Sequence, residues 1–157
     1  MTSHSGTVSD PIYRGRTLVA GSATGPILHL TEPLSFWGGM EVATGRIIDQ
    51  HHPQVGTCLS GCILVMPAGR GSSSSSSVLA EAIYAGTAPA AIILSEPDVI
   101  VALGAMVAKE LYGLSCPVVV IEEPTFDEGT LIEVNATTEA AICRIAGGSH
   151  RAKPTAL

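Results

Sequence analysis

The sequence predicts a single α/β domain with three layers, β/β/α, built on a central βαβαβ unit with short strands on both sides. Three observations favour this fold class. Continuous apolar runs of strand length recur three times, as is typical of parallel strands covered on both faces. The segments between these runs have helical character and end at a glycine. Further short apolar segments lie before and after the unit, separated by turn residues.

The central unit alternates strands and helices. Its three predicted strands are residues 62–66 (CILVM), 90–94 (AAIIL) and 117–121 (PVVVI). The first helix is expected over residues 78–85, stopping at Gly86. The second is expected over residues 99–112, with Asp98 as its N-cap and Gly113 at its end. This order of elements indicates right-handed parallel crossovers.

The flanking segments complete the predicted domain. Four more strands are expected, at residues 16–20, 26–30, 129–134 and 140–145. Residues 21–25 form the turn or short loop between the first two strands, and residues 31–46 form a long loop. We place the domain at residues 14–146, between a flexible N-terminus (1–13) and a flexible C-terminal tail (147–157).

Composition excludes several classes of function. The net charge of −6 and the 4% aromatic content argue against nucleic-acid binding, which needs clustered positive charge. No apolar stretch reaches the roughly 20 residues that span a bilayer, so no membrane association is expected. The N-terminus lacks the features of a signal peptide, which favours the cytoplasm. A 46% hydrophobic content in so small a domain indicates that some surface is covered by a partner protein.

The cysteines and histidines do not predict a metal site. Cys58 and Cys62 lack the spacing of a zinc knuckle, and no second pair follows them. Most of the four cysteines are expected to act as small buried hydrophobic residues. His51 and His52 are read as surface histidines before a turn, although a metal cluster near them is conceivable. We expect no metal to be bound by this chain.

The turn at residues 67–77 (PAGRGSSSSSS) has the features of an anion site. It joins a predicted buried strand to a helix, and a helix start presents unpaired N–H groups that favour negative charge. Gly71 and its neighbouring glycine allow a ligand to approach the backbone closely. Arg70 can bind a carboxylate or phosphate through two parallel hydrogen bonds. Ser72 would lie beside the anion.

Alternative readings of this turn carry different weight. The sequence matches neither a Walker A loop nor a nucleophile elbow. A serine-rich linker is rejected because a strand and a helix flank the run closely. Helix capping remains the reading for the later serines, Ser75 or Ser76. For Ser72 we favour a functional role.

The long loop offers candidate pocket residues. Phe36 and Trp37 either line a pocket mouth that faces a partner or plug the core of this domain, with equal weight. Gly38 and Gly39 indicate a tight turn or a close backbone approach. Glu122 and Glu123 follow a strand end and are read as a solvated loop.

Three segments together resemble a known family. They are residues 34–39 (LSFWGG) with 44–49 (TGRIID) and His52-Pro53, residues 67–72 (PAGRGS) with Ser76 and 78–79, and residues 86–90 (GTAPA) with 102–105 (ALGA). Over residues 14–145 the sequence resembles the swivel domain, or small subunit, of the aconitase X family. It departs from the family pattern between Ser72 and Ser76, where a glycine, and often Cys or Thr, is expected.

The resemblance implies a swivelling β/β/α domain and a two-part dehydratase. A large catalytic subunit of the aconitase X type would carry an iron–sulfur cluster or a divalent metal, and this chain alone would bind no cofactor. By motif position, Ser72 would be the catalytic proton acceptor. A small anionic substrate would be bound by Arg70, Gly71, Ser73 and Ser76.

The resemblance leaves the substrate open. Family members dehydrate cis-3-hydroxy-L-proline or mevalonate 5-phosphate, and the first is favoured because the chain has only two lysines. A non-catalytic alternative is a swivelling carrier or binding domain. His150 in the tail superficially resembles the phosphohistidine of such carriers, but it follows the last predicted strand.

Overall fold

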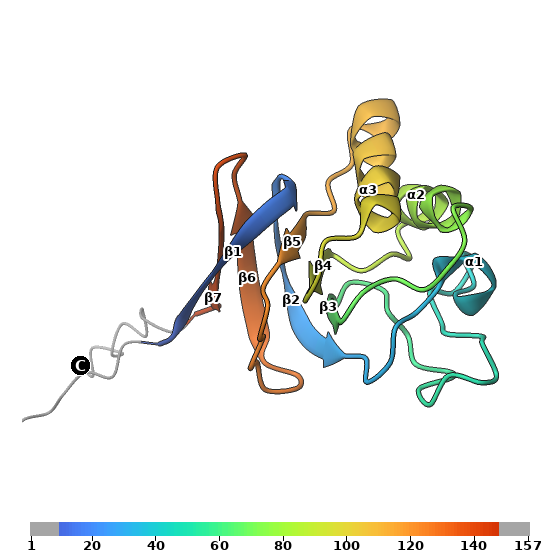
Figure 1. The fold of residues 1–157 in the computed structure, drawn as a ribbon, viewed down its shortest axis with the longest axis horizontal. Helices are drawn as coiled ribbons and strands as arrows, with labels where there is room; N and C mark the ends of the chain where they lie inside the picture. Colours follow the sequence, from blue (N-terminus) through green and yellow to red (C-terminus); the bar gives the residue numbers. More distant parts are fainter. Residues whose placement is uncertain (1–9, 148–157) are drawn as a thin grey trace, which may run out of the picture.

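The computed structural model describes residues 10–147, in which seven strands form a closed barrel with helices on one side (Figure 1). The strands are β1 (Ile12–Val19), β2 (Gly21–His29), β3 (Ile63–Met66), β4 (Ala91–Leu94), β5 (Val118–Val120), β6 (Leu131–Ala136) and β7 (Ala141–Ile145). The helices are α1 (Phe36–Gly39), α2 (Ser75–Ala85) and α3 (Val99–Tyr112). Around the barrel the order is β1-β5-β4-β3-β2-β6-β7, and β7 pairs with β1.

The predicted βαβαβ unit is confirmed. Strands β3, β4 and β5 are neighbours and run parallel. Alternate residues of β3 face opposite sides: Ile63 contributes to the core inside the barrel, and Leu64 to the core beneath the helices. Both faces are therefore covered, which explains why the strand is apolar at every position.

The helices end as the sequence predicts. Asp98 caps α3 by accepting hydrogen bonds from the N–H groups of Ile100 and Val101. Gly86 and Gly113 follow α2 and α3 in the left-handed conformation that is common after a helix. The start of α2 is earlier than expected, at Ser75.

The expected turn at residues 21–25 is wrong, because these residues are part of β2. Strands β1 and β2 have eight and nine residues and are longer than expected. Each pairs along one part of its length with the antiparallel strands β6 or β7 and along the other part with the parallel strands β3 or β5. The first six residues of β2, Gly21–Pro26, pair with β6, and its last three, Ile27–His29, pair with β3. Strand β1 likewise pairs with β7 and then with β5. Strands that pass from one sheet to the other close the barrel.

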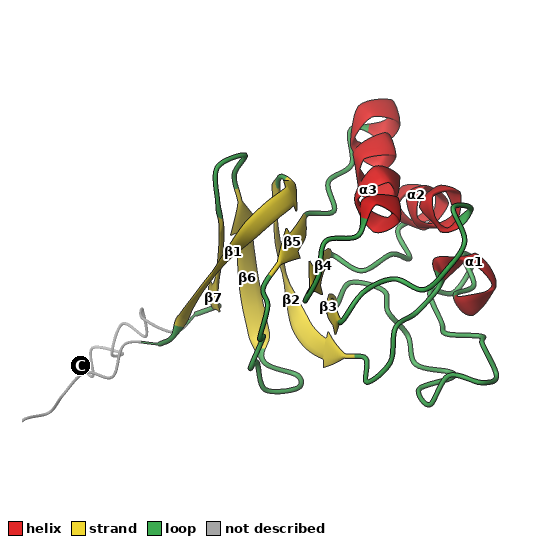
Figure 2. Cartoon of the chain, viewed as in Figure 1, coloured by secondary structure: helices red, strands yellow, loops and turns green. Residues whose placement is uncertain are grey.

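The three predicted layers are present (Figure 2). An antiparallel wall contains β6 and β7, a parallel wall contains β3, β4 and β5, and α2 and α3 cover the outer face of the parallel wall. The N-terminal boundary differs from expectation, because Ile12 and Tyr13 already belong to β1. Residues 1–9 and 148–157 lie outside the described residues, and so do His150 and nearly all of the predicted C-terminal tail.

Helices α2 and α3 approach closely at Gly104. A Cβ atom there would lie 2.7 Å from the backbone oxygen of Ser76 and 3.1 Å from Cβ of Leu79. We expect Gly104→Val to force the helices apart and to lower the free energy of unfolding by about 1–3 kcal/mol. Urea denaturation measures this, with exposed Glu110→Val on the same helix as the control for helix propensity. Equal losses in the two variants would contradict the close-packing explanation.

The four cysteines are free thiols in the structure, and only Cys58 is exposed. Burial raises the pKa of Cys62 and Cys116 from the ordinary 9.0 to about 12, and that of Cys143 to about 11. At pH 8 we expect one thiol of the folded chain to react with a disulfide reagent, and four after unfolding in guanidinium. Rapid labelling of more than one thiol in the folded chain would contradict this burial.

The same three pKa shifts predict how stability depends on pH. The unfolded chain loses these thiol protons first, because their folded-state pKa values are higher. The contribution of the buried thiols is therefore complete below about pH 9 and is lost as the pH rises toward 12. Urea midpoints measured across this range check the direction.

Candidate active site

The turn between β3 and α2 requires glycine at two positions. Gly71 has φ +82°, a left-handed conformation that side chains rarely adopt. Gly69 lies against α3, and a Cβ atom there would be 2.8 Å from Oδ2 of Asp98. The two glycines thus let the chain turn sharply between the end of the strand and the helix while remaining in contact with the start of α3.

Asp98 holds the turn in place. Its Oδ2 accepts a hydrogen bond of 3.0 Å from the N–H of Gly69, while its Oδ1 accepts bonds from Ile100 and Val101 at 2.9 and 3.0 Å. One carboxylate therefore caps α3 and also fixes the turn, and we call these three bonds the Asp98 clamp. The sequence predicted the cap and missed the bond to Gly69.

The long loop is joined to the same turn. Leu34 and Gly69 form a parallel β-bridge, and the N–H of Arg70 donates to the carbonyl oxygen of Leu34 at 3.1 Å. The Oγ of buried Ser75 lies 3.0 Å from Ser35 Oγ and accepts a bond of 3.1 Å from the N–H of Trp37. The structure therefore brings together two of the sequence segments on which the resemblance rests.

Ser75 was expected only as a possible cap. Its burial could have been anticipated, because it continues the inward-facing positions of α2, which include Leu79, Ala82 and Ile83. A serine at such a position needs a polar partner, and the long loop supplies it.

The serine run begins with a local turn. The N–H of Ser74, the N-cap position of α2, donates to Ser72 Oγ at 3.1 Å, and the N–H of Ser75 donates to the Ser72 carbonyl oxygen. The expectation that Ser75 or Ser76 caps the helix is wrong, because Ser74 is the N-cap residue and no side chain makes a capping hydrogen bond there. Ser76 Oγ donates to the Ser73 carbonyl oxygen at 2.8 Å, and Ser73 is exposed. The half-buried Ser72 hydroxyl therefore receives a backbone N–H at the helix entrance.

The positive charge at the site comes from Arg70 and the start of α2. Arg70 is exposed, and within residues 10–147 its guanidinium makes no hydrogen bond or ion pair. Helix α2 has no acidic residue in its first turn and no side-chain bond at its N-cap. The start of α3, by contrast, is already neutralised by Asp98. An anion at this edge is therefore favoured at α2, next to Arg70.

The depression at Ser72 is too small for a substrate by itself. It has a volume of about 10 Å³, room for about one water molecule. Its lining residues come from the turn, the long loop and the start of α3, and include Leu34, Phe36, Gly71, Ser72, Ser75 and Asp98. Small-molecule pockets usually have volumes of roughly 300–1,000 Å³. A complete substrate site here needs walls from another domain or chain.

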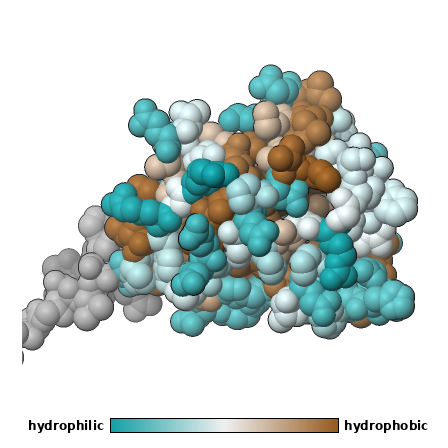
Figure 3. Space-filling view, viewed as in Figure 1, coloured by the Kyte–Doolittle hydropathy of each residue, from teal (hydrophilic) through white to brown (hydrophobic). Residues whose placement is uncertain are grey.

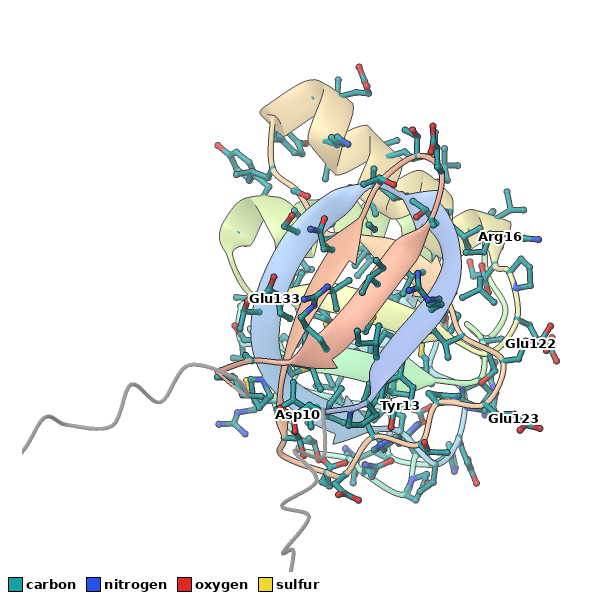
Figure 4. All side chains as sticks on the ribbon, turned by 90° about the vertical axis from the view of Figure 1, so that its left-hand side faces the viewer. Asp10, Tyr13, Arg16, Glu122, Glu123 and Glu133 are labelled. Carbon is teal, nitrogen blue, oxygen red and sulfur yellow. The ribbon has the colours of Figure 1, made fainter. Side chains whose placement is uncertain are left out.

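A larger open cleft lies at the ends of β4 and β5. It has a volume of about 610 Å³ and is lined by charged side chains, among them Arg14, Arg16, Glu122 and Glu123. Figure 4 shows Arg16, Glu122 and Glu123 along one edge of the barrel. Both glutamates are exposed, as expected for a solvated loop. The cleft adjoins the turn. The carbonyl oxygen of Pro67, in the turn, accepts hydrogen bonds from the backbone N–H groups of Ser95 and Glu96, which line the cleft.

The candidate loop residues have different positions. Phe36 is fully buried and belongs to the core, whereas Trp37 is 58% exposed. Gly38 has φ +74°, as a tight turn requires, and a Cβ on Gly39 would lie 2.9 Å from Leu34 Cδ1. Among these four residues, Trp37 and the exposed Gly38 thus remain available to contact a partner, and Trp37 offers the large side chain.

The described part of the chain offers no cluster of three or more His, Cys, Asp or Glu side chains that could hold a metal ion. The reading of His52 as a surface residue is wrong. It is 3% exposed, its Nδ1 accepts a hydrogen bond from the N–H of Gln54, and its Nε2 lies 3.3 Å from the Glu32 carbonyl oxygen. His52 organises the long loop.

Comparison with known proteins identifies the family. Residues 12–142 match the model of the aconitase X swivel domain. This chain belongs to the aconitase X family. A solved structure, the holo-form of aconitase X from Thermococcus kodakaraensis, superimposes with a TM-score of 0.75 at 32% identity, covering 85% of this chain and 98% of that one. The fold described above is thus that of the swivel domain.

Two sets of curated relatives match this swivel domain. The cis-3-hydroxy-L-proline dehydratase of Pseudomonas aeruginosa is 55% identical over 72% of the chain, and that of Hypocrea jecorina is 41% identical over 83%. The matched parts are 19% and 22% of those proteins, so the chain spans about a fifth of their length. The phosphomevalonate dehydratase small subunit of Methanothermobacter thermautotrophicus is 45% identical, with 59% of this chain and 71% of that subunit covered.

No helix of residues 10–147 is both long and apolar enough to cross a membrane.

Proposed function

We propose that this swivel domain forms half of the active site of a hydro-lyase that dehydrates cis-3-hydroxy-L-proline, with Ser72 as the proton acceptor. A large catalytic subunit of the aconitase X type completes the site. The two relatives named for this substrate support the reaction, the first at 55% identity. Since the chain spans about a fifth of these relatives, the activity belongs to the assembled protein.

One observation carries the proposal: the Ser72 hydroxyl is held by a backbone N–H beside an exposed arginine, at a depression too small to enclose a substrate. A serine hydroxyl is a poor base at neutral pH, so its anionic form must be stabilised. The N–H of Ser74, the start of α2 and Arg70 all favour negative charge at this place. Closure by the large subunit would exclude water and strengthen each interaction.

The chemistry follows from this arrangement. Arg70, with Gly71 and Ser73 beside it, holds the substrate carboxylate. The Ser72 alkoxide takes the proton from the carbon next to that carboxylate, and the electron pair of the broken C–H bond forms the new carbon–carbon double bond. The bond from the adjacent carbon to its hydroxyl group breaks, and the departing hydroxide leaves as water after taking up the proton that Ser72 removed, directly or through solvent. Ser72 is thereby restored to its alkoxide form.

The partner and the cofactor belong to the same proposal. We place an iron–sulfur cluster or a divalent metal on the large subunit, where it would act as a Lewis acid for the leaving hydroxyl. This chain's own role is to bind the anion and to hold the proton at Ser72. The four free thiols favour a reducing compartment, so we place the reaction in the cytoplasm.

The test is reconstitution. The purified chain is mixed with a candidate large catalytic subunit, and dehydration of cis-3-hydroxy-L-proline is followed by formation of the unsaturated product. Activity only in the mixture is the expected result. If every stable complex with such a subunit fails to dehydrate any substrate, the proposed function is wrong. Phosphoenolpyruvate labelling of His150 in that case would support a carrier.

Mevalonate 5-phosphate is the second candidate substrate. The 45% identity to a phosphomevalonate dehydratase small subunit supports it, because the match covers 71% of that subunit. The same reconstituted complex is assayed with both substrates at equal concentrations. A higher kcat/KM for mevalonate 5-phosphate would reassign the substrate and leave the role of Ser72 unchanged.

A further inference from the structure

The outer side of α3 is an exposed apolar surface. Three large side chains, spaced four and three residues apart on one side of the helix, are between 47% and 81% exposed, and we call them the α3 face: Val99, Leu103 and Met106. Figure 3 shows hydrophobic side chains gathered over the region where Figure 1 places this helix. Helix α3 has few charges, and the Nζ of Lys109 is directed back to the carbonyl oxygen of Ala20 at 3.1 Å.

A groove accompanies this face. It has a volume of about 270 Å³ and lies between α3 and β1, with Leu18, Pro97, Ala102, Leu103 and Met106 among its lining residues. Its lining is almost entirely apolar. A concave apolar groove beside protruding apolar side chains is typical of the centre of a protein interface.

We propose that the α3 face and its groove dock against apolar side chains of the large catalytic subunit that completes the active site. This inference rests on the proposed function and adds the surface through which the two parts assemble. The groove and the Ser72 depression share Asp98, and Val99 directly follows it. A partner that covers the Ser72 depression would therefore also reach the first residue of the α3 face.

The relatives indicate the kind of occupant. In the two cis-3-hydroxy-L-proline dehydratases, about four-fifths of the chain lies outside the part that matches this swivel domain. That remaining part is large enough to cover both the depression and α3. A second copy of this chain could cover α3, but it would supply only another small Ser72 depression and not the missing walls of the substrate site. The large subunit is therefore the occupant to which the surface is best suited.

The experiment compares matched substitutions. Leu103→Glu and Met106→Glu place a charge in the α3 face, where the side chains are 47% and 49% exposed. Leu131→Glu is the control, because Leu131 is 49% exposed on β6, in the antiparallel wall. Titration calorimetry with the large subunit that gives dehydration should show Kd raised roughly tenfold or more by each α3 variant. The control should bind as the unsubstituted chain does.

Three outcomes would overturn the inference. The first is an unchanged Kd for both α3 variants in a complex that still dehydrates its substrate, which leaves the proposed function intact. The second is a dimer of the chain alone in sedimentation equilibrium that the α3 variants dissociate while their affinity for the large subunit is unchanged. The third, independent of folding of the variants, is the absence of new hydrogen-exchange protection over residues 99–112 when the unsubstituted chain binds. A wild-type chain that binds no large subunit overturns both proposals.

Discussion

Ser72→Ala is expected to lower kcat of the reconstituted dehydratase by about 10²- to 10⁴-fold, the range typical of a lost general base. The half-buried Oγ of Ser72 lies at the entrance of α2 and receives the N–H of Ser74, so no other serine of the run has the same position. Steady-state assays with saturating large subunit measure this effect. KM should change much less than kcat, because Arg70 and the backbone remain to hold the carboxylate.

The matched control is Ser77→Ala, which removes an exposed hydroxyl from the same run. It should keep nearly full activity. Ser72→Ala also removes the hydrogen-bond acceptor for the Ser74 N–H, so the free energy of unfolding should fall by about 1 kcal/mol. Thermal unfolding separates this modest loss of stability from the loss of rate. A well-folded Ser72→Ala complex with full activity would exclude Ser72 as the base.

Asp98→Ala is expected to have the largest effect on stability. It removes the acceptor for three N–H groups, two at the start of α3 and one at Gly69. Loss of the cap and of the partner for Gly69 should together lower the free energy of unfolding by about 2–3 kcal/mol. Urea denaturation measures the change, with exposed Glu96→Ala as the neighbouring control.

Asp98→Asn separates the two roles of the clamp. Asparagine caps helices about as well as aspartate, so stability should fall by less than about 1 kcal/mol. Its amide has only one oxygen, however, so either the cap of α3 or the bond to Gly69 is lost. Because the turn that carries Ser72 is then held less firmly, kcat should fall by at least about tenfold. Full activity in Asp98→Asn would show that the clamp does not position Ser72.

The prediction of an anion site at this turn rests on local determinants. The glycines at positions 69 and 71, the neighbouring arginine and the first serine act over a few residues of chain, and the motif alone indicated an anion site. The roles of individual serines were harder to assign. Serines 72 to 77 are chemically identical, so only the helix start and the direction of each hydroxyl distinguish them. The structure places the N-cap at Ser74, contrary to expectation. It gives the Ser74 N–H to Ser72 Oγ and turns Ser76 toward the Ser73 carbonyl oxygen.

The sequence by itself determined the βαβαβ unit and the ends of its helices. A strand covered on both faces must be apolar at every position, and capping by Asp98 depends on residues only two and three positions away. Only the tertiary structure decided how the barrel closes and how the turn is held. Ile12 pairs with Arg144, Ser75 meets Ser35 across 40 positions, and Asp98 reaches Gly69 across 29. Contacts between such distant residues leave no periodic pattern in the chain, because they depend on where the packed layers bring each segment.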